Sequence, residues 1–110
     1  MLLAWIPPTF AAAMMTIEGL FLSNQFWTFI EFSKNSKVIL TVEEHSIFGG
    51  LGECCASLIA QNNINVKLKI LGIPDEYMIN GSQADVLDHY DMSPEKIAEI
   101  SKDLLNKWVI

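Results

Sequence analysis

Two acidic residues and a histidine stand side by side in the middle of this 110-residue chain, at Glu43, Glu44 and His45. Carboxylates beside an imidazole can transfer protons near neutral pH, so this triplet is the first candidate for catalytic chemistry. It ends a run of β-branched and apolar residues that is typical of a strand, and neighbouring side chains on a strand point to opposite faces. The three groups therefore cannot all converge on one substrate, and we favour a structural or domain-contact role over catalysis.

Three glycines, Gly49, Gly50 and Gly52, follow the triplet and precede a helical pattern. The chain must turn sharply there and pack its backbone closely. A strand-to-helix turn at the carboxyl edge of a parallel sheet can also hold an anion on its backbone N–H groups. The third glycine of a dinucleotide fingerprint is missing, however, and Glu53 would repel phosphate. We therefore favour tight-turn packing over nucleotide binding.

The two cysteines, Cys54 and Cys55, are adjacent in the sequence. Neighbouring cysteines rarely form a disulfide with each other because the resulting ring is strained. The two histidines, His45 and His89, do not complete a metal-ligand spacing with them. We interpret both cysteines as reduced thiols of a cytoplasmic protein and expect no metal site.

Composition and charge narrow the class of protein and of partner. With 51% hydrophobic and 18% charged residues, the chain can bury the core of one folded domain. Its formal net charge is −6, and it has only seven Lys and Arg residues in all. Phosphate backbones are bound by clustered Lys and Arg, so we expect no nucleic-acid partner.

The pattern from residue 37 onward predicts an α/β domain. Residues 37–43 form a β-branched apolar run of strand length, residues 51–62 place apolar side chains three and four apart, and residues 66–71 alternate polar and apolar. A strand, a helix and a strand in that order predict a parallel, right-handed βαβ unit.

The remaining segments predict helices. A capping box formed by Ser82 and Asp85 opens a short helix through Tyr90, and Ser93 followed by Pro94 opens a last helix. Residues 24–33 are compatible with a further helix that leads into the first strand.

The first 28 residues form a separate, divergent apolar segment. No Lys or Arg precedes Lys34, and the pair Pro7-Pro8 interrupts the apolar run. Glu18 ends that run short of the ~20 residues that a membrane-spanning helix needs. A signal peptide would begin with positive charge, which is absent. We expect no membrane partner.

Residues 41–52, with the sequence TVEEHSIFGGLG, resemble the T-V-E-E-H-x-x-x-G-G-L-G signature of transketolase carboxyl-terminal domains. The same register continues through Gly72-Ile73-Pro74-Asp75, Gly81, Leu87, Tyr90 and Ser93-Pro94-Glu95-Lys96-Ile97. This order also resembles the related synthase of deoxyxylulose phosphate and the β subunits of 2-oxo acid dehydrogenases, but the Glu-Glu-His triplet favours transketolase. We therefore divide the chain into residues 1–28 and a transketolase C-terminal-like domain at 29–110.

The resemblance implies a small three-layer α/β domain whose first strands are missing, as a truncated gene would produce. It implies a parent enzyme that transfers a two-carbon ketol unit between sugar phosphates, with thiamine diphosphate and magnesium held by two preceding domains. We therefore carry over no catalytic, cofactor-binding or metal residue and expect no activity from this chain alone. The candidate turn and contact site comprises Glu44, His45, Gly49, Gly50, Gly52 and Asp75.

The expected partners are the missing domains or a second copy of the chain. Lost strands would leave an unpaired sheet edge and exposed apolar surface, so we expect a homo-oligomer. Two alternatives remain open: a free-standing module that binds an anion or nucleotide, and a subunit of a split transketolase.

Overall fold

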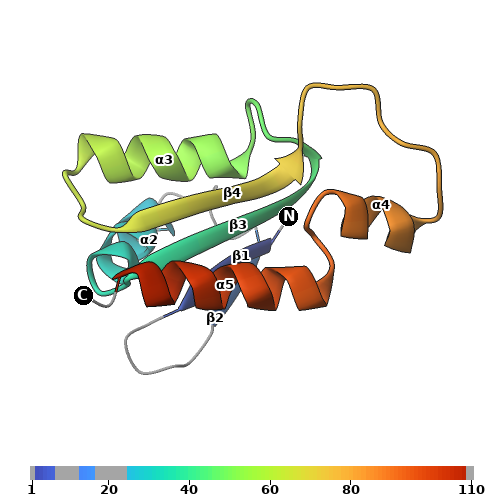
Figure 1. Ribbon diagram of the computed structural model, residues 1–110. Helices are drawn as coiled ribbons and strands as arrows, with labels where there is room; N and C mark the ends of the chain where they lie inside the picture. Colours follow the sequence, from blue (N-terminus) through green and yellow to red (C-terminus); the bar gives the residue numbers. More distant parts are fainter. Residues whose placement is uncertain (1, 7–12, 17–24, 109–110) are drawn as a thin grey trace.

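The computed structural model describes residues 2–6, 13–16 and 25–108 of the chain, with side chains from Phe26 to Lys107. A four-stranded mixed sheet in the order β2-β1-β3-β4 forms the centre of this structure (Figure 1). In chain order the elements are β1 (Leu2–Ile6), β2 (Ala13–Thr16), α2 (Gln25–Lys34), β3 (Val38–Ser46), α3 (Leu51–Gln61), β4 (Lys67–Ile73), α4 (Gln83–His89) and α5 (Pro94–Trp108).

The predicted βαβ unit is confirmed by β3, α3 and β4. The two strands pair in parallel from Val38 opposite Lys67 to Val42 opposite Leu71, and an irregularity then precedes the pair Ser46 and Ile73. Beyond Val42, β3 continues through the whole Glu-Glu-His triplet, three residues further than the sequence predicted. The triplet is therefore strand from end to end, and its side chains alternate between the two faces of the sheet.

Helices cover both faces of the sheet, which confirms the three-layer α/β prediction (Figure 1). On one face Ile39 packs against Phe29 of α2 and against Leu51 and Cys55 of α3. On the other face a larger cluster joins the sheet to α5 and to the segment after α4; its buried members are Val38, Leu40, Leu71, Tyr90, Met92 and Leu104. The three- and four-residue spacings of the helices thus bury the faces that the sequence predicted.

The predicted starts of the two helices after β4, at Ser82 and Ser93, are also confirmed. Ser82 Oγ accepts a hydrogen bond from Asp85 N–H at 3.2 Å, and Asp85 Oδ2 accepts one from Ser82 N–H at 3.1 Å. Ser82 Oγ also donates to Asp85 Oδ2 at 2.6 Å. The two hydrogen bonds that the Asp85 carboxylate accepts lower its pKa, chiefly the one from the Ser82 side chain and then the one from the Ser82 backbone. At the start of α5, Ser93 Oγ donates to Asp88 Oδ1 at 3.0 Å, which ties the last two helices together.

Strands β1 and β2 were not predicted. β1 pairs antiparallel with β3, from Leu2 opposite Val42 to Ile6 opposite Val38, and β2 pairs antiparallel with β1. β1 therefore covers the side of β3 that faces away from β4, and the outer strands of the described sheet are β2 and β4. A continuous apolar run carries no period that separates strand from helix, which explains why the sequence did not reveal β1 and β2. The boundary drawn after residue 28 falls within α2.

Candidate functional site

The candidate site lies where the chain leaves the sheet, at the carboxyl ends of β3 and β4. The end of β3 supplies the Glu-Glu-His triplet, and a short turn through Gly49 and Gly50 leads into α3 at Leu51 (Figure 1). The loop from Pro74 to Ser82 leaves β4 at the same edge and leads to α4. Parallel strands therefore bring both loops to one end of the molecule.

Glu43 is fully buried on the face of the sheet that α3 covers. Its Oε1 accepts a hydrogen bond from the backbone N–H of Leu51, the first residue of α3. Its Oε2 has no hydrogen-bond partner among the described residues. A carboxylate that accepts one of the free N–H groups at a helix start satisfies that group and complements the helix dipole. Glu43 thus fixes the position of α3 on the sheet.

His45 lies on the same face as Glu43, two residues further along β3. Its Nε2 is 3.8 Å from Glu43 Oε1, and its side chain is about half exposed. Its Nδ1 is 2.8 Å from the Ser46 carbonyl oxygen, which can only accept, so Nδ1 carries the proton of that hydrogen bond. His45 therefore covers the buried carboxylate from the solvent side.

The glycines of the turn are required by two different physical causes. Gly49 has a φ of +69°, in the left-handed region that favours glycine. Gly50 has a φ of −107°, which any residue can adopt, but a Cβ there would overlap Glu43 Oε1 and lie 2.8 Å from His45 Cε1. A Cβ at Gly52 would lie 2.6 Å from Ile70 Cγ2, so the first turn of α3 rests directly on β4.

Carboxylates already accept two of the N–H groups in this turn, which weighs against an anion site. Besides the bond from Leu51 to Glu43, Gly49 N–H donates to Glu53 Oε2 at 2.7 Å. Two acidic side chains at the amino end of α3 would repel a phosphate from the position where a nucleotide-binding turn holds it. The geometry therefore favours the packing interpretation of the glycines.

Cys55 does not offer an activated nucleophile. Both thiols are free, and Cys55 is fully buried in the core beneath α3. Burial raises the pKa of Cys55 to about 12, and the nearby Cys54 and Glu43 act in the same direction. Within the described ranges, no three His, Cys, Asp or Glu side chains gather as a metal site.

Glu44 and Asp75 lie apart from the group around Glu43. Glu44 points to the opposite face of β3, where it borders a pocket with Ile73 and Met78. Asp75 is exposed in the loop after β4, next to Glu76. In the structure, His45 and Gly50 therefore lie next to Glu43, whereas Glu44 and Asp75 lie on the surface of the domain.

Glu43 is the important residue that the candidate set left out. The sequence carried a usable signal, because Glu43 shares its face with Ile39 and Thr41 and directly follows five apolar or β-branched residues, Val38 to Val42. A charged residue in register with a core face requires a specific partner, and here the partner is a backbone N–H.

Comparisons with known proteins agree with this architecture. Residues 26–97 match the family described as transketolase, C-terminal domain. An apulose-4-phosphate transketolase subunit of Phocaeicola vulgatus is 38% identical over 69 residues, which make up 63% of this chain and 22% of that protein. A putative transketolase C-terminal section of Methanocaldococcus jannaschii is 43% identical over 66 residues, 60% of this chain and 21% of that protein.

The related synthases appear as well. The 1-deoxy-D-xylulose-5-phosphate synthase of Symbiobacterium thermophilum is 36% identical over 67 residues, 61% of this chain and 10% of that protein. The chain thus spans about a fifth or less of the length of these curated relatives.

Among the described residues, no helix is both long and apolar enough to cross a membrane.

Proposed function

Because this chain belongs to the family of transketolase carboxyl-terminal domains, we propose that it is the structural, partner-contacting domain of a thiamine-diphosphate-dependent enzyme. The parent reaction is the transfer of a two-carbon ketol unit from a ketose phosphate to an aldose phosphate. The cofactor and its magnesium are held by other domains, so this chain supplies no catalytic residue and is inactive alone.

The observation that carries this proposal is that the polar side chains of the signature segment, residues 41–52, make contacts within the domain. Glu43 is buried and holds α3, and Gly50 leaves room for its carboxylate. His45 closes the arrangement from outside at 3.8 Å. These contacts engage Glu43 and His45 within the fold, whereas general acid–base catalysis requires groups aimed at a common substrate position.

The residues present do not fit thiamine diphosphate. A diphosphate needs backbone N–H groups or cationic side chains, whereas the turn before α3 carries Glu43 and Glu53. The described residues also bring no three metal-ligating side chains together. Both observations support a cofactor site outside this domain.

A partner chain is supported by the names of two relatives. One is called a subunit and the other a C-terminal section, so relatives of this domain occur as parts of larger assemblies. We propose that this chain completes a split enzyme of that kind. We also expect it to self-associate, since Trp27 and Phe48 leave 69% and 60% of their surface exposed.

Two measurements on the purified chain test the inactive, cofactor-free role. Titration calorimetry with thiamine diphosphate and Mg²⁺ should give no saturable heat, and a coupled ketol-transfer assay should give no turnover. Saturable binding at micromolar cofactor would overturn this part of the proposal.

Co-expression with a chain that carries the cofactor domains, sought in the neighbouring DNA, tests the contact role. The two chains should co-elute, and ketol transfer should require both. A cofactor chain that is fully active without this domain would contradict the proposal.

A further inference from the structure

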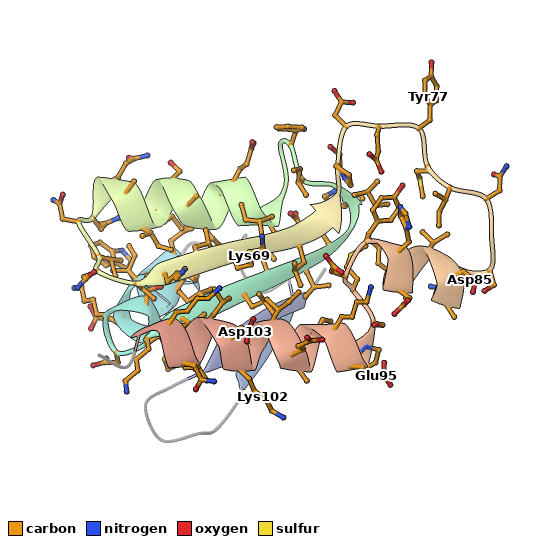
Figure 2. All side chains as sticks on the ribbon, viewed as in Figure 1. Lys69, Tyr77, Asp85, Glu95, Lys102 and Asp103 are labelled. Atoms are coloured by element: carbon orange, nitrogen blue, oxygen red, sulfur yellow. The ribbon has the colours of Figure 1, made fainter. Side chains whose placement is uncertain are left out.

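Apolar side chains are exposed on the loops that leave the carboxyl edge of the sheet. Phe48 follows β3 with 60% of its surface exposed, and Met78 follows β4 with 53% exposed. Tyr77 is fully exposed and points away from the loop between β4 and α4 (Figure 2). Exposed apolar groups that gather at one end of a small domain are typical of a protein contact surface.

A pocket of about 170 Å³ opens beside this loop. It lies between the end of β3, the end of β4 and α4, and its walls include Glu44, Ile73, Met78, Val86, Leu87 and Met92. Sites for small ligands commonly have volumes of about 300–1,000 Å³, whereas a cavity of about 150 Å³ holds a group the size of benzene. The pocket is therefore suited to one apolar side chain.

Glu44 is the acidic residue that lines the pocket, and Asp75 and Glu76 lie in the loop between two other lining residues, Ile73 and Met78. The carboxylates of Glu44, Asp75 and Glu76 have no hydrogen bond or ion pair with the part of the chain that the structure describes. Residues 38–66 contain three acids and residues 70–95 contain six, and neither segment contains a Lys or Arg. Lys96, the next cation along the chain, lies 3.3 Å from Asp91 and 3.9 Å from Asp88.

We propose that this pocket, here called the Glu44 pocket, receives an apolar side chain of a partner protein, and that a Lys or Arg beside that side chain pairs with Glu44. The apolar walls supply the burial. Glu44 and the two acids of the adjacent loop, Asp75 and Glu76, form an acidic rim that favours a basic segment over an acidic one. This inference names the chemistry of the partner surface and therefore rests on the proposed contact role. An acidic partner, a phosphate or a nucleic acid would be repelled by the rim.

Peptides give a direct test that needs no identified partner. The probe is an acetylated, amidated pentapeptide with leucine between two arginines and terminal glycines, titrated into the ¹⁵N-labelled full chain and followed by NMR. We expect saturable shifts at the amides of Ile73, Met78 and Val86. The matched peptides replace leucine with glycine, or both arginines with glutamates, and should bind more weakly.

Two variants separate the pocket from general charge. Glu44→Gln removes the exposed rim charge and should weaken the arginine peptide about two- to fivefold, as expected for an exposed ion pair. Asp103→Asn removes one charge from α5 (Figure 2) and should leave the affinity unchanged. About 1 M salt, where the Debye length is about 3 Å, should reduce the affinity of the wild type more than that of Glu44→Gln.

The outcomes distinguish this inference from the proposed function. Equal binding of the glutamate peptide, or equal effects of Glu44→Gln and Asp103→Asn, would overturn the basic-segment inference. Concentration-dependent shifts at these amides without peptide would assign the pocket to a second copy and would also overturn it. If co-expressed cofactor chain still assembles with Glu44→Gln and Met78→Ala at wild-type affinity, the contact role stands but the Glu44 pocket is not its docking site.

Discussion

The substitution Gly50→Ala is expected to destabilise the domain by displacing a buried carboxylate. The new Cβ would overlap Glu43 Oε1 and lie 3.0 Å from Glu43 Cδ, and neither atom has free space because Glu43 is fully buried. The backbone itself would accept alanine, since the φ of Gly50 is −107°. The cost therefore comes from the contact with Glu43 and not from backbone strain.

The magnitude follows from what the Glu43 carboxylate would lose. Its hydrogen bond to Leu51 N–H is charge-assisted, and bonds of this kind contribute about 1.5–3 kcal/mol. Leaving the buried donor without a partner adds about 1–3 kcal/mol. Alanine stabilises the folded state by about 0.4–1 kcal/mol by restricting the unfolded chain. We expect a net loss of about 2–4 kcal/mol.

Urea denaturation of four proteins tests the cause as well as the size. They are the wild type, Gly50→Ala, Glu43→Ala and the double variant, and they form a double-mutant cycle. In the Glu43→Ala background the overlapping carboxylate is gone, so Gly50→Ala should become nearly neutral. The coupling energy between the two positions should then be about 2–4 kcal/mol, the same as the cost of Gly50→Ala in the wild type.

Gly49 provides the matched control for this cycle. A Cβ at Gly49 would meet no atom within 4 Å, but its φ of +69° is unfavourable for alanine by about 1–2 kcal/mol. Gly49→Ala should therefore cost the same with and without Glu43. Additive effects of Gly50→Ala and Glu43→Ala would refute the proposed contact between the buried carboxylate and the turn.

Three further predictions concern thiols, pH and association. Native Cys54 should react with iodoacetamide before the buried Cys55, whose pKa of about 12 disfavours the thiolate, and both should react in denaturant, as peptide mass spectrometry can show. The lowered folded pKa of Asp85 means that its stabilising contribution is present above its ordinary value of 3.8 and is lost as the pH falls through the folded value. The difference in melting temperature between wild type and Ser82→Ala should therefore be largest near neutral pH and shrink below pH 3.8; a constant difference would contradict the capping box. Removing residues 1–22 deletes β1 and β2 and exposes the edge of β3, so sedimentation should show more self-association, whereas less association would place this segment at the contact between copies.

The central part of the fold could be predicted because local and tertiary signals agree there. The β-branched apolar run at residues 37–43 predicted a buried strand, and the spacing of Leu51 and Cys55 identified the buried face of α3. At the helix starts, Ser82 and Ser93 identified the boundaries through side-chain chemistry that acts within a few residues. Such signals depend on neighbours in sequence and are therefore readable without a structure.

The position of β1 depends on a partner that is distant in sequence. Its five residues pair with β3 across more than thirty intervening positions, and no turn chemistry links the two strands directly. Apolar residues at Leu2–Ile6 fit a strand with neighbours on both sides as well as they fit a buried helix. The site was predicted in part for the same reason: the glycine turn is local, but the burial of Glu43 arises only when α3 folds back onto β3.

Successive side chains of β3 point to opposite faces of the sheet, so adjacent residues of the signature segment have different roles. Glu43 and His45 face α3, where the carboxylate holds Leu51 N–H, whereas Glu44 faces the pocket and makes no contact that satisfies its charge among the described residues. We therefore expect removal of the Glu43 charge to affect folding, and removal of the Glu44 charge to leave folding unchanged and to affect the proposed contact with a partner. Three neighbouring residues can resemble one catalytic constellation in sequence, yet the strand divides them between the inside of the fold and the surface that a partner meets.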